Sequence, residues 1–404
     1  MKPIYIAPFL LALCLLASCS SGDDEPEVIV PQDATLTLSV APGSVLTKSS
    51  PRATTAVKTL AGEAKINNIC AALFKEDGSL LTSSYVDYAA GAGGSKTPDT
   101  IRISAKSITN YTYVILVNVG NKSFSTLEKL KEETFALKDI KVDNQPMCSQ
   151  FKNVTLKPGA NYIGSKEVFT EASEEEFLSK ESIKVYRTAS RIDFEKIGVT
   201  WSDENATDLK KANARFLLKR VYATQVKSHT YLTDRSTGDQ SVEVKNGTDG
   251  LSYLDGKESG SASYLETLNL FNPSEDAESV IISSGSSIES EDINGGTPWR
   301  CYVTENTESG LTLPTTLILK GDILPETGEE PILKDRYFFV RLKDMKDTQE
   351  KLLPGIIRNY VIRISATITG KGSGDETYRE NASAIVTVTP DDWSVEETQH
   401  EGVN

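Results

Sequence analysis

The chain has 404 residues, of which 38% are hydrophobic and 25% are charged, with a net charge of −14. This is the composition of a globular chain with a sizeable core, and at ~100–200 residues per domain its length predicts two domains. The acidic balance excludes a nucleic-acid binder that tracks phosphates with basic residues. With two histidines and no CxxC in the chain, Cys70, Cys148 and Cys301 predict neither a zinc site nor a disulfide framework. We expect these cysteines to be buried as small hydrophobic residues.

Residues 1–18 have the pattern of a secretory signal, with Lys2 followed by an apolar run from Ile4 to Leu16. This run is shorter than the ~20 residues that a membrane span requires. The small residues before Cys19 predict cleavage there and lipidation of Cys19, for example with palmitate; an ordinary signal peptide that contains a cysteine is the alternative. The acidic patch of residues 23–25 resembles the tag that sends lipoproteins of Bacteroides-type bacteria to the outer face of the outer membrane, although a solvated tether would look the same.

Alternation with a period of two residues dominates the remainder and predicts a mostly-β fold. The segment 113–119 is almost continuously apolar, as expected of a strand buried on both faces. The segment 360–368 alternates, with its even-numbered residues toward a core, and 338–342 and 384–388 also read as strands. The apolar run 69–74 before Asp77-Gly78 predicts a hairpin with a type I′ turn.

Helical signals are few. A capping-box pattern at 125–128 predicts a short helix, 173–179 is a second candidate, and 228–299 predicts long loops with a few short strands. The glycine-rich segment 370–373 lacks the spacing of a phosphate loop and predicts a hairpin loop. No catalytic set of residues is apparent and no pair of carboxylates is singled out, so we predict a protein that is not an enzyme and has no cofactor or metal.

One strand precedes an unusually long connection. In residues 34–40 the apolar residues Ala34, Leu36, Leu38 and Val40 share one face. A polar stretch that contains Arg52 then separates this strand from the next one, and connections beyond ~12–15 residues are uncommon without a functional reason. The strand either opens the first domain in the ordinary way or belongs to a segment that is removed by cleavage in the loop.

The order of the motifs resembles the type V pilins, or fimbrillins, of Bacteroidales. The resemblance is carried by the lipobox, the acidic tether, the first strand, the arginine before a small residue, and a series of loose motifs that spans the chain. These motifs are the strand 113–118 ending in Asn118, Pro146-Met147, 187–192, the Tyr-x-x-Glu-Asn element within 301–306, and 358–360.

The resemblance implies two tandem transthyretin-like β-sandwiches and maturation by an arginine-specific surface protease between Arg52 and Ala53. Cutting would let strand 34–40 leave, and the opened groove would accept a strand from another subunit. In the family the donor strand comes from the C-terminus, where Trp393 and Val395 continue the alternation but residues 396–404 are more polar than a groove-filling strand should be.

The predicted organisation is therefore a signal peptide (1–18), a lipidated tether with a removable strand (19–52), and two sandwiches (53–180 and 181–404). The expected function is that of a structural fimbrial subunit at the outer membrane and cell surface. Its expected partners are other pilin subunits, the protease, membrane lipid through Cys19 before cleavage, and a host or bacterial adhesion receptor, but no nucleic acid. The alternative is a surface-anchored lipoprotein that binds glycans or host ligands through its sandwiches.

Overall fold

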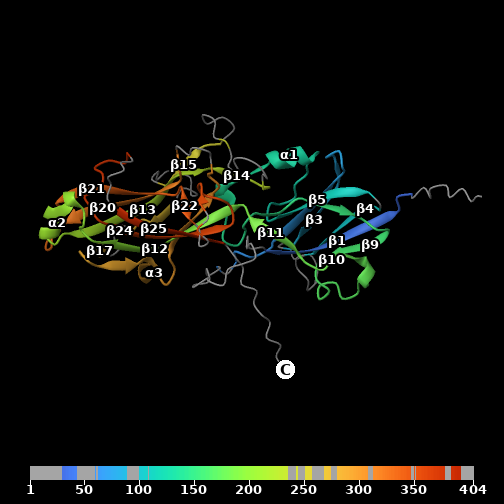
Figure 1. Ribbon diagram of the computed structural model, residues 1–404, viewed down its shortest axis with the longest axis horizontal. Helices are drawn as coiled ribbons and strands as arrows, with labels where there is room; N and C mark the ends of the chain where they lie inside the picture. The colour runs from blue at the N-terminus through green and yellow to red at the C-terminus, as the bar shows by residue number, and fades with distance from the viewer. Residues whose placement is uncertain are drawn as a thin grey trace, which may run out of the picture.

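The computed structural model describes residues 30–42, 60, 62–88, 100–107, 109–234, 243, 251–256, 268–273, 280–307, 313–346, 350, 352–377 and 384–392. Predictions on Cys19, Arg52, Ala53, Trp393 and Val395 fall outside these ranges. The described chain is mostly β with a few short helices, as predicted, and Figure 1 shows it as two β-rich halves side by side along the long axis.

Ten strands form the N-terminal half. In chain order they are β1 (Asp33–Pro42), β2 (Asn68–Phe74), β3 (Leu80–Asp87), β4 (Thr100–Lys106), β5 (Asn110–Val117), β7 (Met147–Ser149), β8 (Lys152–Thr155), β9 (Gly159–Ile163), β10 (Phe177–Ser179) and β11 (Ile183–Arg187). The order along the sheet is β10-β9-β1-β11-β7-β5-β2-β3, with β4 paired to β1 and β8 to β5.

Strand β5 is buried on both of its faces, as its continuous apolar sequence predicts. Tyr113, Ile115 and Val117 enter the main core of this half, whereas Val114 and Leu116 enter a smaller cluster on the other face. The helix α1 (Leu127–Glu132) contributes Leu130 to that smaller cluster. A sheet covered on both sides needs no polar face, which explains the absence of alternation here.

The C-terminal half contains two sheets that pack face to face. The five-stranded sheet consists of β12 (Ala189–Val199), β18 (Ser287–Glu289), β19 (Trp299–Thr304), β24 (Tyr360–Ile368) and β25 (Ala384–Asp392). The six-stranded sheet consists of β13 (Arg215–Lys227), β15 (Tyr253–Asp255), β16 (Asn269–Phe271), β17 (Val280–Ile282), β20 (Thr316–Leu324) and β21 (Leu333–Arg341).

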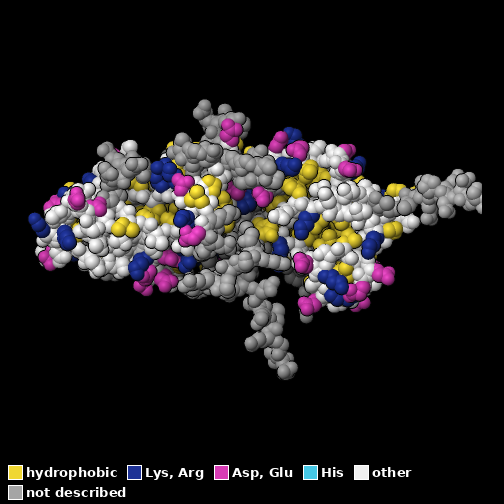
Figure 2. Space-filling view, viewed as in Figure 1, with side chains coloured by type: hydrophobic (Ala, Val, Ile, Leu, Met, Phe, Trp, Pro, Cys, Tyr) yellow, Lys and Arg dark blue, Asp and Glu magenta, His cyan; other side chains and the backbone are white. Residues whose placement is uncertain are grey.

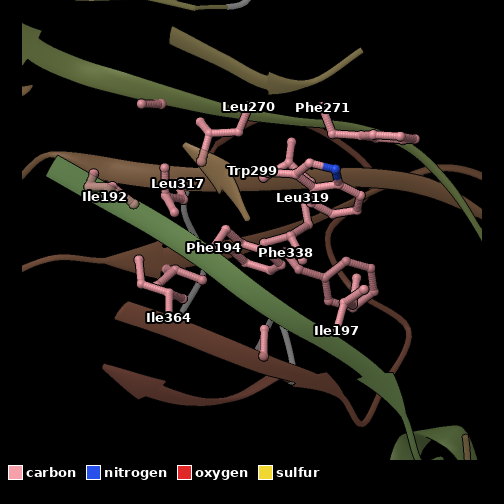
Figure 3. Packing of buried hydrophobic residues seen from close by; sticks show 14 of the residues in the cluster. Ile192, Phe194, Ile197, Leu270, Phe271, Trp299, Leu317, Leu319, Phe338 and Ile364 are labelled. Carbon is pink, nitrogen blue, oxygen red and sulfur yellow. The ribbon is translucent and has the colours of Figure 1, made fainter. Parts of the chain in front are cut away.

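A large apolar core lies between these two sheets. Figure 3 shows Phe194 of β12 beside Trp299 of β19, with Phe271 and Phe338 from the opposite sheet nearby. The ring centroids of Phe194 and Trp299 are 5.9 Å apart, and those of Phe271 and Trp299 are 4.5 Å apart. Aromatic pairs at these separations stabilise a core beyond the area they bury.

The remaining elements are short. They are two helices, α2 (Thr207–Lys211) and α3 (Ser290–Ile293); three 3₁₀ turns, η1 (Leu137–Asp139), η2 (Glu174–Glu176) and η3 (Glu204–Ala206); and two strand pairs, β6 (Thr134–Ala136) with β14 (His229–Tyr231) and β22 (Met345–Lys346) with β23 (Leu352–Leu353). In the view of Figure 2, basic and acidic side chains are interspersed over both halves.

Three local predictions need correction. The hairpin between β2 and β3 forms, but only Gly78 of its Asp77-Gly78 pair has a positive φ, and the Gly78 amide bonds to the Lys75 carbonyl at 2.9 Å. This is a type I turn followed by a left-handed glycine, not type I′. Helix α1 is capped by Thr126 instead of Ser125. The second helical candidate, 173–179, is only the 3₁₀ turn η2 followed by strand β10.

The chain leaves the N-terminal half at Arg187. Strand β11 lies after the boundary expected at residue 180, yet it pairs with β1 and β7. The next strand, β12, pairs instead with β19 and β24 in the other half. A single extended segment therefore crosses between the halves.

Candidate functional site: the groove filled by the first strand

Strand β1 occupies the middle of the N-terminal half. Figure 1 shows it, in blue, running beside β9 and β4. Asp33–Ser39 pairs antiparallel with β4, Ala34–Leu38 pairs parallel with β9, and Val40–Pro42 pairs parallel with β11. Its backbone groups are thus paired along both edges for much of its length.

Strand β1 also connects the two layers of this half. Strands β4, β9 and β10 form one group, and β11, β7, β5, β8, β2 and β3 form the other. Among the described residues, β1 is the strand with ladder pairs in both groups. Without β1, β4 and β9 would each present an unpaired edge to a vacant slot.

The predicted apolar face of β1 points into the core. Ala34 and Val40 are each 3% exposed, and Leu36 and Leu38 are completely buried. At ~1.5–3 kcal/mol for each large side chain, the two leucines and Val40 together contribute about 5–9 kcal/mol. Whole domains have a net stability of only ~5–15 kcal/mol. The groove therefore requires an occupant, and four apolar positions spaced by two residues define that occupant.

Few side-chain contacts of β1 require a particular residue. Asp33 pairs with Lys106 at 2.7 Å, but both side chains are exposed, and such pairs contribute little. The hydroxyls of Ser39 and Ser182 lie 2.9 Å apart. Most of the interaction is thus apolar burial and backbone pairing, which any strand with the same alternation could supply.

The chain resumes at the far end of the long connection in a different environment. Glu63 is completely buried at the junction of the two halves. Its carboxylate accepts bonds from Arg191 Nη1 at 2.6 Å and from the Tyr302 hydroxyl at 2.8 Å, and also from the Leu60 amide at 2.9 Å. The Arg187 guanidinium donates to the Glu63 carbonyl at 3.2 Å.

The charges in this cluster compensate one another. Arg191 also pairs with Asp193 at 2.7 Å. Burial by itself would lower the pKa of Arg191, but Asp193 and Glu63 outweigh it, so the net effect raises that pKa. Burial lowers the pKa of Arg187 to about 10, although the Glu63 charge opposes this. A buried charge that keeps its partners is tolerated, whereas removing one partner strands the other.

Asn118 bonds to the segment that follows Glu63, at Lys65 and Asn67. Its side-chain amide donates to the carbonyls of Lys65 at 2.8 Å and Gln145 at 2.9 Å, while its side-chain oxygen accepts from the Asn67 amide at 2.7 Å. Asn118 has a φ of 60°, a left-handed conformation that asparagine tolerates better than most residues. The motif asparagine at the end of β5 thus fixes the entry into β2.

The other motifs meet at this junction too. Tyr302 reaches Glu63, while Glu305 forms an ion pair with Arg358 and accepts from its amide. The Asn359 side chain accepts from the Arg187 amide at 3.1 Å. These residues are far apart in the sequence, and the structure gives them a shared architectural role.

Sequence reasoning missed Glu63. It lies in a stretch interpreted as loop, and its partners Arg191 and Tyr302 are 128 and 239 positions away. The available signal was that each partner stood in a motif with no assigned role.

The cysteine prediction is confirmed, because Cys70, Cys148 and Cys301 are free and buried. Burial raises the pKa of the Cys148 thiol to about 12, which makes it unreactive. Within the described ranges, no group of three or more residues is arranged to hold a metal ion. None of the described helices has the length and apolar character needed to span a membrane.

Fold and groove together define a protein of two β-sandwich halves whose first strand completes the N-terminal core. Comparison with known proteins agrees with this class. The family model described as Major fimbrial subunit protein (FimA) matches residues 34–214, beginning within β1. The chain is 26% identical over 254 residues to the protein named Putative fimbrium tip subunit Fim1C of Parabacteroides distasonis. That match covers 60% of this chain and spans 63% of the relative's length.

Solved structures show the same fold. A structure titled putative cell adhesion protein from Parabacteroides distasonis has a TM-score of 0.62 at 20% identity, with 88% of this chain and 96% of that chain covered. A fimbrilin from Porphyromonas gingivalis has a TM-score of 0.55 at 18% identity, with 90% and 98% covered. The predicted resemblance to the Bacteroidales fimbrillins and the predicted mostly-β sandwich fold are confirmed.

Proposed function

We propose that this chain is the precursor of a structural subunit of cell-surface fimbriae, without enzymatic activity. It is exported as a lipoprotein held through Cys19 at the outer membrane, and an arginine-specific protease releases it by cutting between Arg52 and Ala53. Residues 19–52 then form the removable segment. The two domains of the mature subunit follow it and meet at Arg187, where the chain passes from β11 to β12, not at residue 180 as expected from the sequence.

The contrast between the two sides of the long connection carries this proposal. On one side, β1 is held by apolar burial and backbone pairing that another strand can reproduce. On the other side, the chain from Leu60 onward is held by Glu63 and Asn118. A cut between them would free only the replaceable part. The family-model match and the fimbrial relative support the fimbrial role itself.

Assembly then proceeds by strand exchange. A strand from another subunit enters the slot between β4, β9 and β11, pairs with their backbone groups and fills the apolar positions that β1 leaves. Because cutting does not remove the burial energy of β1, cleavage permits the exchange and the incoming strand drives it.

The proposed donor segment of this chain begins at Trp393, directly after β25, and includes Val395. Glu396 and Glu397 follow, and a charge placed in an apolar groove is costly. These residues favour an accessory or tip position over the stalk, as in the relative named Putative fimbrium tip subunit Fim1C. The mature subunit contributes to adhesion at the cell surface.

The experiment is limited digestion of the folded precursor with an arginine-specific protease. We expect a mature chain beginning at Ala53 and polymers that form after cleavage, with Arg52→Ala uncut and monomeric. Precursor that is cut at Ala53 but never polymerises, alone or with other subunits, would overturn the fimbrial proposal. Protein from intact cells that begins at a lipidated Cys19 would favour an anchored binding lipoprotein instead.

A further inference from the structure

The six-stranded sheet of the C-terminal half has an unusual outer face. Val221, Ala223, Leu317 and Leu319 of its central strands enter the core between the two sheets. Their sequence neighbours point the other way and form rows across β13, β20 and β21, because Tyr222 pairs with Ile318, which pairs with Phe339. The next row consists of Thr224, Thr316 and Arg341.

One row of this outer face is apolar, where a solvent face is usually polar. Tyr222, Ile318 and Tyr337 are buried as a cluster of their own, with Phe339 packed against them. The connection after β24 lies along the edge strand β21, since the backbones of Tyr337 and Ser373 exchange two hydrogen bonds of 3.0 and 2.9 Å. This connection therefore extends the sheet beyond β21, and its residue Glu376 reaches the outer face.

On the outer face of the six-stranded sheet lies a cavity of about 370 Å³. Its volume is within the ~300–1,000 Å³ range of small-molecule sites. Ile318 and Phe339 supply an apolar floor, while Gln225, Asp255, Arg341 and Glu376 supply polar groups around it. The Tyr222 hydroxyl is buried close by, and burial, followed by the charges of Glu376 and Asp255, raises its pKa. This hydroxyl therefore stays protonated beside the two carboxylates.

Gln225 has a strained backbone. Its φ is 57°, and the pairing of β13 with β15 shifts register between Thr224 and Val226. A bulge of this kind redirects a side chain, and non-glycine residues in this region cluster at ligand sites. The strain is held in place from outside the cavity, because the Gln225 carbonyl accepts from the Thr315 hydroxyl at 3.2 Å.

We propose that this cavity binds a neutral saccharide unit of a surface glycan. A sugar ring has an apolar face that packs on an aromatic or aliphatic floor and hydroxyls that both donate and accept. The lining offers both, because Phe339 and Ile318 form the floor, the two carboxylates accept, and Arg341 and Gln225 donate. Two carboxylates against one guanidinium disfavour an anionic sugar or a phosphate.

This proposal does not depend on strand exchange, because the cavity lies in the half that does not contain β1. It would give a fimbrial subunit, or an anchored lipoprotein, a direct means of adhesion.

The test uses the full chain and a glycan array of neutral and sialylated oligosaccharides that includes lactose, maltose, N,N′-diacetylchitobiose and 3′-sialyllactose, followed by calorimetric titration of the best neutral sugar. We expect neutral sugars to bind, and Phe339→Ala and Arg341→Gln each to weaken binding about tenfold or more, since each removes a contact that desolvation makes costly to lose. Ile385→Thr, on the exposed face of β25 in the other sheet, is the matched control and should bind as wild type does.

Arg341→Gln keeps a polar side chain at the sheet edge, so it separates loss of binding from loss of folding if Phe339→Ala is unstable. Absence of binding to every neutral sugar, preference for the sialylated sugar, or equal binding by wild type and Arg341→Gln would each overturn the proposal. Binding of a basic peptide such as trilysine in place of sugars would also overturn it, because the two carboxylates would then be the recognition element.

Discussion

Replacing Leu36 by alanine should loosen β1 in its groove without disturbing the rest of the fold. Leu36 is completely buried and packs in the core between the two layers of the N-terminal half. Buried leucine-to-alanine changes cost about 2–5 kcal/mol, depending on how far the cavity collapses. A cost of about 3 kcal/mol corresponds to a factor of about 100 in an equilibrium or a rate.

The effect is measured after cutting, when β1 is held only by non-covalent contacts. The precursor is cut within residues 43–59, either at Arg52 or at an engineered protease site. A fluorescent synthetic peptide of residues 33–42 with the wild-type sequence is then added, and its incorporation into the subunit is followed by anisotropy and native mass spectrometry. We expect peptide exchange to be about 100-fold faster with Leu36→Ala than with wild type, because the leucine contact is lost before β1 leaves.

Thr37→Ser on the same strand is the matched control. Thr37 faces away from the apolar core and is only partly buried, so its exchange rate should stay close to that of wild type. Equal rates for Leu36→Ala and wild type would refute the reasoning, since β1 would then not be held by its apolar face. Acceleration by Thr37→Ser to the same extent would show instead that cutting unfolds the whole N-terminal half.

Three further results are expected. Glu63→Gln should lower the free energy of unfolding by about 3–5 kcal/mol in denaturant titration, because it leaves Arg191 buried without its full charge compensation; an exposed substitution such as Glu128→Gln serves as the control, and equal midpoints would contradict the buried network. Burial, aided by the Lys138 charge, lowers the pKa of His229 below its ordinary value of 6.5. The unfolded chain therefore binds more protons than the folded one, and the free energy of unfolding should fall as the pH drops below 6.5. His229→Gln should reduce the change in urea midpoint between pH 7.5 and 5.5, and an unchanged pH dependence would exclude this histidine as the cause. The three buried thiols, those of Cys70, Cys148 and Cys301, should not react with Ellman's reagent until the mature chain is unfolded. Rapid reaction under native conditions would contradict their burial.

Periodic features of the structure were predictable from the sequence. The apolar face of β1, the two-sided burial of β5 and the alternation of β24 follow from side-chain periodicity, which is local and needs no knowledge of the partner strands. Turn type was less predictable. Asp77-Gly78 is compatible with two hairpin geometries, and the choice between them is set by the register of the flanking strands.

The junction could not have been predicted in the same way. Glu63 contacts residues 128 and 239 positions away, and no local pattern encodes such a pair. The cavity on the outer face of the six-stranded sheet was equally hidden. Its lining comes from β13, β15, β20 and β21, from Leu313 before β20, and from Glu376 in the connection after β24. The sequence did mark Tyr302 and Asn118 as motif residues, but not that both hold the segment directly after the long connection.

The apolar contacts that hold β1 and the ion pairs that hold Glu63 differ in chemistry, and this difference bears on strand exchange. Apolar burial is non-directional, so the pockets of Leu36, Leu38 and Val40 accept any side chains of suitable size at the same spacing. Buried ion pairs are directional and tolerate no substitute, because an unmatched charge costs several kcal/mol. A segment that must be replaced by another chain should therefore be held by the first kind of contact, and a segment that must stay should be held by the second. Strand β1 and Glu63 follow this division on either side of Arg52. A charge placed on β1, as in Leu38→Glu, should therefore block correct folding of the precursor. The neutral substitution Glu63→Gln should instead weaken the junction and leave the groove able to accept a strand.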